Sequence, residues 1–265
     1  MNTISLLKEL RGYAVFDNSI VSAIVGKTTP YVNLILYRLK NRKYIIELER
    51  DLYTVQDEPL VIASQSVWPC YISFWTALRH HNLTEQLPQS IYVITTRQKK
   101  NKINFQGKEI KFIVVKPAFF FGYKKERIGK FDIFIAEPEK AIIDSILFNK
   151  ISTSEIFEIL RNNKEDLDFD KLMHYALKIN KNSLIKRIGY MCDFIGKDYI
   201  EGFEYSYKKS QTPQKSTLNL CENKAYSKSS IKETSLDNKY VVLDLKLPAQ
   251  GRKNKKWKVI ENVRI

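Results

Sequence analysis

Three short helical patterns followed by two short strand patterns fill the first 57 residues, and this order constrains the fold most strongly. Leucine and isoleucine recur at helical spacing over residues 4–10, 20–25 and 32–39. Asp17 can cap the second helix and Gly26 can end it, while Pro30 suits the first turn of the third. The strand patterns at 45–48 and 52–55 are separated by a polar turn, 49–51. The order is typical of a winged helix-turn-helix domain over residues 1–57.

The rest of the chain predicts two further parts. Residues 60–150 are expected to be a mixed α/β domain, with a helix over 68–80, strands over 90–96, 111–115 and 132–136, and a helix from 137 to about 148. Residues 151–265 are expected to be mainly helical, with a linker at 206–237 and strands at 240–247 and 257–260 that form a terminal hairpin or pair, separated by a basic loop at 251–256. The expected fold class is therefore α+β.

Charge indicates the kind of partner. The chain has 44 Lys and Arg against 29 Asp and Glu, a net charge of +15, which favours a polyanion such as nucleic acid or an anionic membrane surface. Residues 97–130 hold eleven basic and two acidic residues, and residues 246–265 hold seven and one. These segments are either solvated loops or, because aromatic residues interleave with the lysines, a second surface for nucleic acid or an acidic partner.

Other features predict a cytoplasmic chain. No apolar run approaches the roughly 20 residues that a membrane span needs, and charges interrupt the N-terminal segment where a signal peptide would be apolar. The three cysteines are odd in number and widely spaced, so they predict neither a disulfide framework nor a thiolate metal site.

The third helix is the sharpest candidate for a functional site. Residues 27–43 contain five basic residues and no acidic one. Hydroxyls and free N–H groups at the helix start can meet a phosphate, Asn and Arg can read base edges, and a hairpin tip can reach the DNA backbone. Asn33, Tyr37 and Arg38 are assigned to bases, and Lys27, Lys40, Arg42 and Lys43 to phosphates. The full set of DNA-binding candidates is Lys27, Thr28, Thr29, Tyr31, Asn33, Tyr37, Arg38, Arg42, Lys43 and Arg50. The alternative is a winged helix used for protein contact or as a structural module.

Signals for an enzyme are weak. Neither glycine-rich phosphate-loop pattern occurs, and the three histidines lack a zinc-ligand spacing, so no metal or cofactor is expected. Cys70 and His80 could form a nucleophile pair, but a buried cysteine is the simpler interpretation. Glu137, Glu139 and Asp144 are the one acidic cluster that could do acid–base or metal chemistry, although acids at a helix start also complement its dipole.

Several segments together resemble the AbiEi antitoxin family of type IV toxin–antitoxin systems, which takes part in abortive infection against phage. They are YIS at 71–73, TAL at 76–78, NLTEQLP at 82–88, IYVITT at 91–96, FFFG at 119–122 and IAEPEKAIIDSI at 135–146. The resemblance covers about residues 1–150, with a weaker match in the tail.

The resemblance implies a non-enzymatic repressor with antitoxin activity. The winged helix would bind operator DNA upstream of its own operon, through residues 28–43 and the wing near Arg50. The C-terminal region would counteract a nucleotidyltransferase-like toxin from the next gene, without direct contact being assumed. Two alternatives remain: a stand-alone, ligand-sensing winged-helix regulator, and a nucleic-acid-modifying enzyme that uses Glu137, Glu139 and Asp144.

Overall fold

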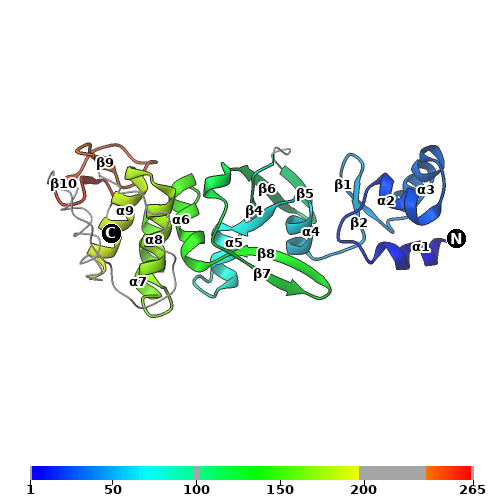
Figure 1. Cartoon of the computed structure of the whole chain (residues 1–265), viewed down its shortest axis with the longest axis horizontal. Coiled ribbons are helices and arrows are strands. Elements are labelled where there is room, and N and C mark those ends of the chain that lie inside the picture. The colour runs from blue at the N-terminus through cyan, green and yellow to red at the C-terminus, as the bar shows by residue number, and fades with distance from the viewer. Residues whose placement is uncertain (1, 98–101, 197–236, 264–265) are drawn as a thin grey trace, which may run out of the picture. The chain divides into compact units, whose positions relative to one another are not determined.

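The computed structural model describes residues 2–97, 102–196 and 237–263, and combines helices with three sheets (Figure 1). The chain divides into two compact units, Met1–Glu137 and Pro138–Ile265. In the described residues no single helix is long and apolar enough to cross a membrane; α2 and α3 reach such a composition only jointly, across a bend of 105°.

The first unit begins with three helices and a hairpin in the predicted order: α1 (Thr3–Leu10), α2 (Asn18–Val25), α3 (Thr29–Asn41), β1 (Ile46–Glu49) and β2 (Leu52–Thr54). The Asp17 side chain accepts hydrogen bonds from the N–H groups of Ser19 and Ile20, and Gly26 ends α2 in the left-handed conformation. The helices enclose a small core of Leu6, Leu10, Phe16, Val21, Val32, Leu36, Leu39 and Ile45. Burial of this apolar surface holds the three short helices together.

A six-stranded mixed sheet follows, with strand order β5-β6-β4-β3-β8-β7. Its strands are β3 (Cys70–Ser73), β4 (Ser90–Thr95), β5 (Lys102–Phe105), β6 (Lys108–Val114), β7 (Tyr123–Ile128) and β8 (Phe131–Ala136). Two helices, α4 (Pro59–Gln65) and α5 (Phe74–His80), pack against it, and a short 3-10 turn, η1 (Pro117–Phe119), precedes β7. β3 pairs in parallel with β8, and β4 with β6; the other neighbours are antiparallel.

The predicted helix over residues 68–80 is wrong in its first part. Residues Cys70–Ser73 form β3 in the middle of the sheet, and the helix begins only at Phe74. All four residues of β3 are buried, because strands lie on both sides of it and the sheet faces are covered. A short, continuous apolar run of this kind fits a buried strand as well as a buried helix, so periodicity alone could not separate them.

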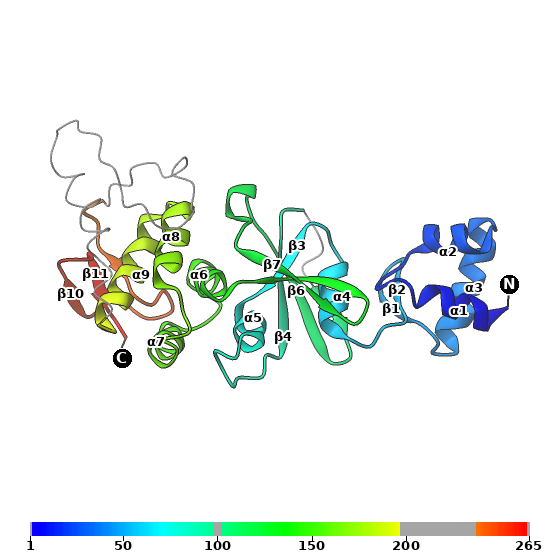
Figure 2. The same cartoon turned by 60° about the horizontal axis from the view of Figure 1, so that its bottom comes forward.

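The second unit contains α6 (Pro138–Phe148), α7 (Thr153–Asn162), α8 (Phe169–Ile179) and α9 (Asn182–Phe194), and then β9 (Val241–Val242), β10 (Arg252–Asn254) and β11 (Val259–Glu261). The helix α6 packs against α8 and α9 (Figure 2). The boundary between the units therefore falls before α6, whereas the sequence placed this helix in the middle domain. Most of the predicted linker, residues 206–236, lies outside the described residues.

The predicted terminal hairpin is also wrong in its pairing. β9 runs parallel to β11, and the antiparallel partner of β11 is β10, from the basic segment that was expected to be a loop. After β9 the chain turns toward α7, because Asp244 accepts a hydrogen bond from the Thr153 N–H (3.2 Å). Trp257 is buried as predicted, and its indole ring lies directly over Gly189 of α9.

Candidate nucleic-acid interface

The third helix separates a buried face from an exposed one. Val32, Leu36 and Leu39 are buried against the small core. The sequence left open whether Ile35 or Leu36 turns inward; Leu36 is the buried residue and Ile35 is half-buried. All ten DNA-binding candidates are exposed: Lys27, Thr28, Thr29, Tyr31, Asn33, Tyr37, Arg38, Arg42, Lys43 and Arg50. Each is therefore accessible to a large partner.

The start of α3 leaves backbone donors available. Thr28 is the N-cap residue in an extended conformation, its side chain makes no capping hydrogen bond, and a proline stands in the first turn. The preceding carbonyl, that of Lys27, accepts a hydrogen bond from the Ser22 hydroxyl (2.6 Å), which fixes the chain where it enters the helix. A helix N-terminus of this kind attracts an anion, because its N–H groups and the helix dipole both point outward.

Three basic residues of the candidate set line one hollow of about 260 Å³, namely Lys27, Arg38 and Arg42. The hollow lies between α3 and the N-terminal end of α1, with Asn2, Thr3 and Tyr31 also in its wall. Gathering three cations in one concave place concentrates positive potential there. The geometry therefore suits a phosphate group.

Asn33 and Tyr37 do not line this hollow. The Asn33 Oδ1 atom accepts a hydrogen bond from the Asn18 side-chain amide (2.8 Å), which ties it to α2. The residues predicted to read bases are thus divided, since Arg38 lies with the phosphate candidates Lys27 and Arg42 while Asn33 and Tyr37 lie outside the hollow. Arg38 is better placed for a backbone contact than for a base contact.

The hairpin carries the last candidate. Arg50 is exposed at the turn between β1 and β2, with its Nε atom 3.5 Å from the Asp51 carboxylate. Lys40 on α3 is paired with Glu47 of β1, which raises the pKa of Lys40 and links the helix to the hairpin. Lys40, which the sequence also suggested for a phosphate contact, thus has a partner inside the domain.

One exposed residue of α3 was missed by the sequence analysis. Leu34 is 43% exposed although it is a leucine. At 100° per residue it lies on the side opposite Val32, Leu36 and Leu39, three residues before Tyr37. A helical wheel centred on the buried residues could have found it, whereas the hydrophobicity of leucine by itself suggests a core position.

The acidic cluster is divided among internal ion pairs. Asp144 pairs with Lys140 one turn before it on α6, and both side chains are buried. Glu139 accepts a hydrogen bond from the N–H of Asp168 (3.1 Å) and lies 3.2 Å from the Lys171 ammonium. Such contacts fix helices within the second unit and are typical of a structural role. Glu137, for its part, lies 3.5 Å from Lys124 in the first unit.

No group of three His, Cys, Asp or Glu residues suited to a metal ion occurs in the part of the chain that the structure describes. The Cys70 thiol donates a hydrogen bond to the carbonyl of Ser64, and burial raises its pKa to about 12. His80 contacts Glu126 instead, at 2.6 Å. Cys70 therefore has the character of a buried core residue and not of an activated nucleophile.

Many lysines of the segment 97–130 are held by acids. Lys102 and Lys111 both pair with Glu109, whose pKa falls to about 2 because of these two hydrogen bonds. Phe105 and Phe112 are buried in the sheet. The segment forms strands β5, β6 and β7 and not the loops that were expected, and its paired lysines and core aromatics favour a solvated surface over a second binding surface.

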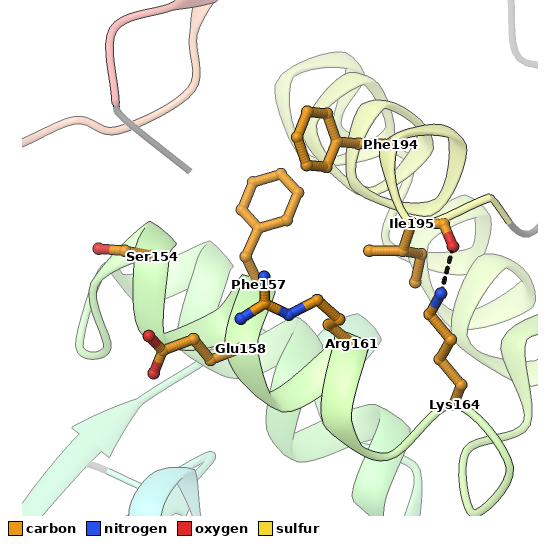
Figure 3. Close-up of a pocket in the computed structure, with 7 residues that line it drawn as sticks. All are labelled: Ser154, Phe157, Glu158, Arg161, Lys164, Phe194 and Ile195. Atoms are coloured by element: carbon orange, nitrogen blue, oxygen red, sulfur yellow. Dashed lines mark hydrogen bonds between the residues drawn. The ribbon is translucent and has the colours of Figure 1, made fainter.

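A second hollow, of about 220 Å³, lies in the second unit (Figure 3). The rings of Phe157 and Phe194 meet edge to face, with centroids 5.4 Å apart. The Lys164 ammonium donates to the carbonyl of Ile195 (2.6 Å), and Arg161 lines the rim. Glu158 also lines this hollow, so acidic, basic and aromatic side chains meet there.

Neither a scan against models of protein families nor a search of curated proteins found a match to this chain.

Proposed function

We propose that residues 1–57 form a winged helix-turn-helix domain that binds duplex DNA and makes this chain a transcriptional repressor. The observation that carries the proposal is the hollow where Lys27, Arg38 and Arg42 converge beside the start of α3. A phosphate in that hollow would fix the position of α3 along the duplex, because backbone contacts set register and orientation. Arg50 at the hairpin turn would supply the wing contact.

The chain is further proposed to be an antitoxin of the type IV class that autoregulates its operon. The support is the resemblance of residues 1–150 to the AbiEi family. Its functional partner would then be a nucleotidyltransferase-like toxin, and its DNA partner the operator upstream of its own operon. The acidic motif Glu139, Lys140 and Asp144 would serve the fold of the second unit and not catalysis, since its charged groups pair internally.

A ligand-sensing regulator is the second candidate. The observation that favours it is the hollow of Figure 3, whose aromatic wall and Arg161 could accept a small effector. Rescue of growth in cells that express the neighbouring toxin separates the two, because an antitoxin rescues growth and a ligand-sensing regulator of another operon does not.

The DNA-binding proposal is tested by titrating the full chain against its own upstream duplex and a scrambled duplex at several salt concentrations. Specific binding is expected to exceed non-specific binding by about a thousandfold or more. Arg38→Ala should weaken binding to both duplexes and reduce the slope of log K against log salt by about 1, as the loss of one phosphate contact does.

Arg11→Ala is the matched control, because Arg11 is equally basic and is exposed directly after α1 but does not line the hollow. It should leave the salt slope almost unchanged. Equal affinity for both duplexes, or equal effects of the two substitutions, would contradict the proposal.

A further inference from the structure

The outer face of α3 combines apolar and aromatic side chains with a basic border. Leu34 is 43% exposed and Tyr37 is 63% exposed, and the two lie one turn apart on the side away from the core. Asn41 is exposed one turn beyond Tyr37. A single exposed leucine is ordinary, but here a leucine and a tyrosine lie side by side next to a basic hollow, and this combination suits burial by a partner.

Charge complementarity identifies the occupant. Lys27, Arg38 and Arg42 line the hollow on one flank of this ridge, and Lys43 is exposed beyond its end. Residues 27–43 contain no acidic residue that would repel a polyanion. A protein partner with an apolar surface would have to bring its own acidic border, whereas duplex DNA has phosphates on both sides of an apolar feature in its major groove.

That apolar feature is the thymine C5-methyl group, the only one among the base edges of the major groove. Leucine offers no hydrogen bond and cannot read any other group there. Tyrosine adds an apolar ring and a hydroxyl that can reach a base or a phosphate. Asn41, by contrast, has an amide that suits adenine, the partner of thymine.

We propose that Leu34 and Tyr37 read thymine methyl groups, so that this chain selects A·T base pairs where α3 meets the bases. The inference rests on the proposed function, since it names the bases that the same helix recognises. In this assignment Leu34, which carries no polar group, contacts bases, whereas Arg38, which lines the hollow, contacts a phosphate.

The test uses the full chain and a short duplex enriched by it from a randomised library. The same duplex is then made with deoxyuridine in place of thymidine, which removes only the methyl groups. We expect binding to weaken by about fourfold for each methyl that the protein buries. Leu34→Ala should weaken binding to the thymidine duplex and lose much of the difference between the two duplexes.

Ile4→Ala is the matched control, because Ile4 is 78% exposed on α1 and does not line the hollow. It should keep the full difference between the duplexes. Leu34→Ala is not expected to harm folding, since the side chain is exposed and alanine favours a helix.

Each failure is distinguishable. If no duplex is enriched, the proposed DNA-binding function itself is wrong. If an enriched duplex binds equally well with deoxyuridine, the DNA-binding function stands and the methyl readout is overturned. If DNA-free protein self-associates and Leu34→Ala abolishes this, a second copy of the chain covers the ridge and the inference is likewise overturned.

Discussion

In most helices, replacement of glycine by alanine is stabilising, but at Gly189 we expect it to be destabilising. Gly189 lies inside α9, and an alanine there would favour the helix by about 1 kcal/mol. However, its Cβ atom would lie 2.1 Å, 2.3 Å and 2.5 Å from three carbon atoms of the Trp257 ring. Ordinary carbon contacts are about 3.5 Å or longer, so the ring would have to retreat by about 1.4 Å.

The Trp257 ring has little room to retreat. The side chain is 3% exposed. Its Nε1–H donates to Asp193 (3.3 Å), and its backbone N–H donates to Asn254 (3.0 Å). Overpacking costs about 1–3 kcal/mol, and three simultaneous clashes place this case near the upper end. After the gain in helix propensity is deducted, we expect Gly189→Ala to destabilise the second unit by about 2 kcal/mol.

The measurement is hydrogen exchange of the α9 amides in the full chain, read together with tryptophan emission. Gly189→Ala should speed exchange in α9 and shift to the red the part of the tryptophan emission that is lost when Trp257 is replaced, as the ring loses its buried position. The control is Trp257→Leu, which removes the indole ring that causes the clash. In that background, alanine at 189 should become neutral or stabilising, a coupling of about 3 kcal/mol. Equal stabilisation by alanine in both backgrounds would refute the reasoning.

Two further predictions concern charged groups. Lys140→Met removes one cation that pairs with the buried Asp144 and should destabilise the second unit by about 3–5 kcal/mol in urea unfolding; Lys140→Met with Asp144→Leu should recover most of this. The pKa of Glu109 is lowered from 4.5 to about 2 by Lys102 and Lys111, so its contribution is complete above pH 4.5 and is lost as the pH falls toward 2. Glu109→Gln should therefore show a smaller fall in Tm over that range, and an unchanged fall would contradict the assignment.

Local signals allowed the first 57 residues to be predicted in their element order. Helix α2 begins after the capping residue Asp17 and ends at Gly26, which is left-handed, as the sequence predicts. Pro30 stands in the first turn of α3. These signals act within one helical turn, so no knowledge of distant residues is needed to interpret them.

Pairings between distant residues could not be predicted in the same way. Whether Cys70–Ser73 is a strand depends on β4 and β8, which follow about 20 and 60 residues later. The parallel pairing of β9 with β11 depends on α7 and α9, where Thr153 and Arg187 hold residues 242–244 by hydrogen bonds. Neither dependence leaves a mark in the local pattern.

The candidate site was predictable in its location but not in its internal geometry. Exposure of the candidates within α3 follows from helical periodicity, and exposure of the others follows from their polar positions at the helix ends and in the hairpin turn. The grouping of Arg38 with Lys27 does not follow, because α1 forms the other wall of the hollow and its position is set by tertiary packing. The exposure of Leu34 was hidden by the assumption that a leucine in an amphipathic helix belongs to the core.

The acidic motif shows why residue types alone were a poor guide to chemistry. Glu139 and Asp144 belong to a helix that starts directly after a strand, a pattern shared by many catalytic acids. In the structure, Lys140 on the same helix and Lys171 on α8 neutralise them. A carboxylate paired with a buried lysine must break that pair before it can accept a proton or bind a metal. Breaking the pair would leave the lysine charge buried without compensation, and the free-energy cost of this opposes such a role. The contacts of Glu139 with Lys171 and with the N–H of Asp168 join α6 to α8, which is consistent with a second unit that begins at Pro138 and not after α6.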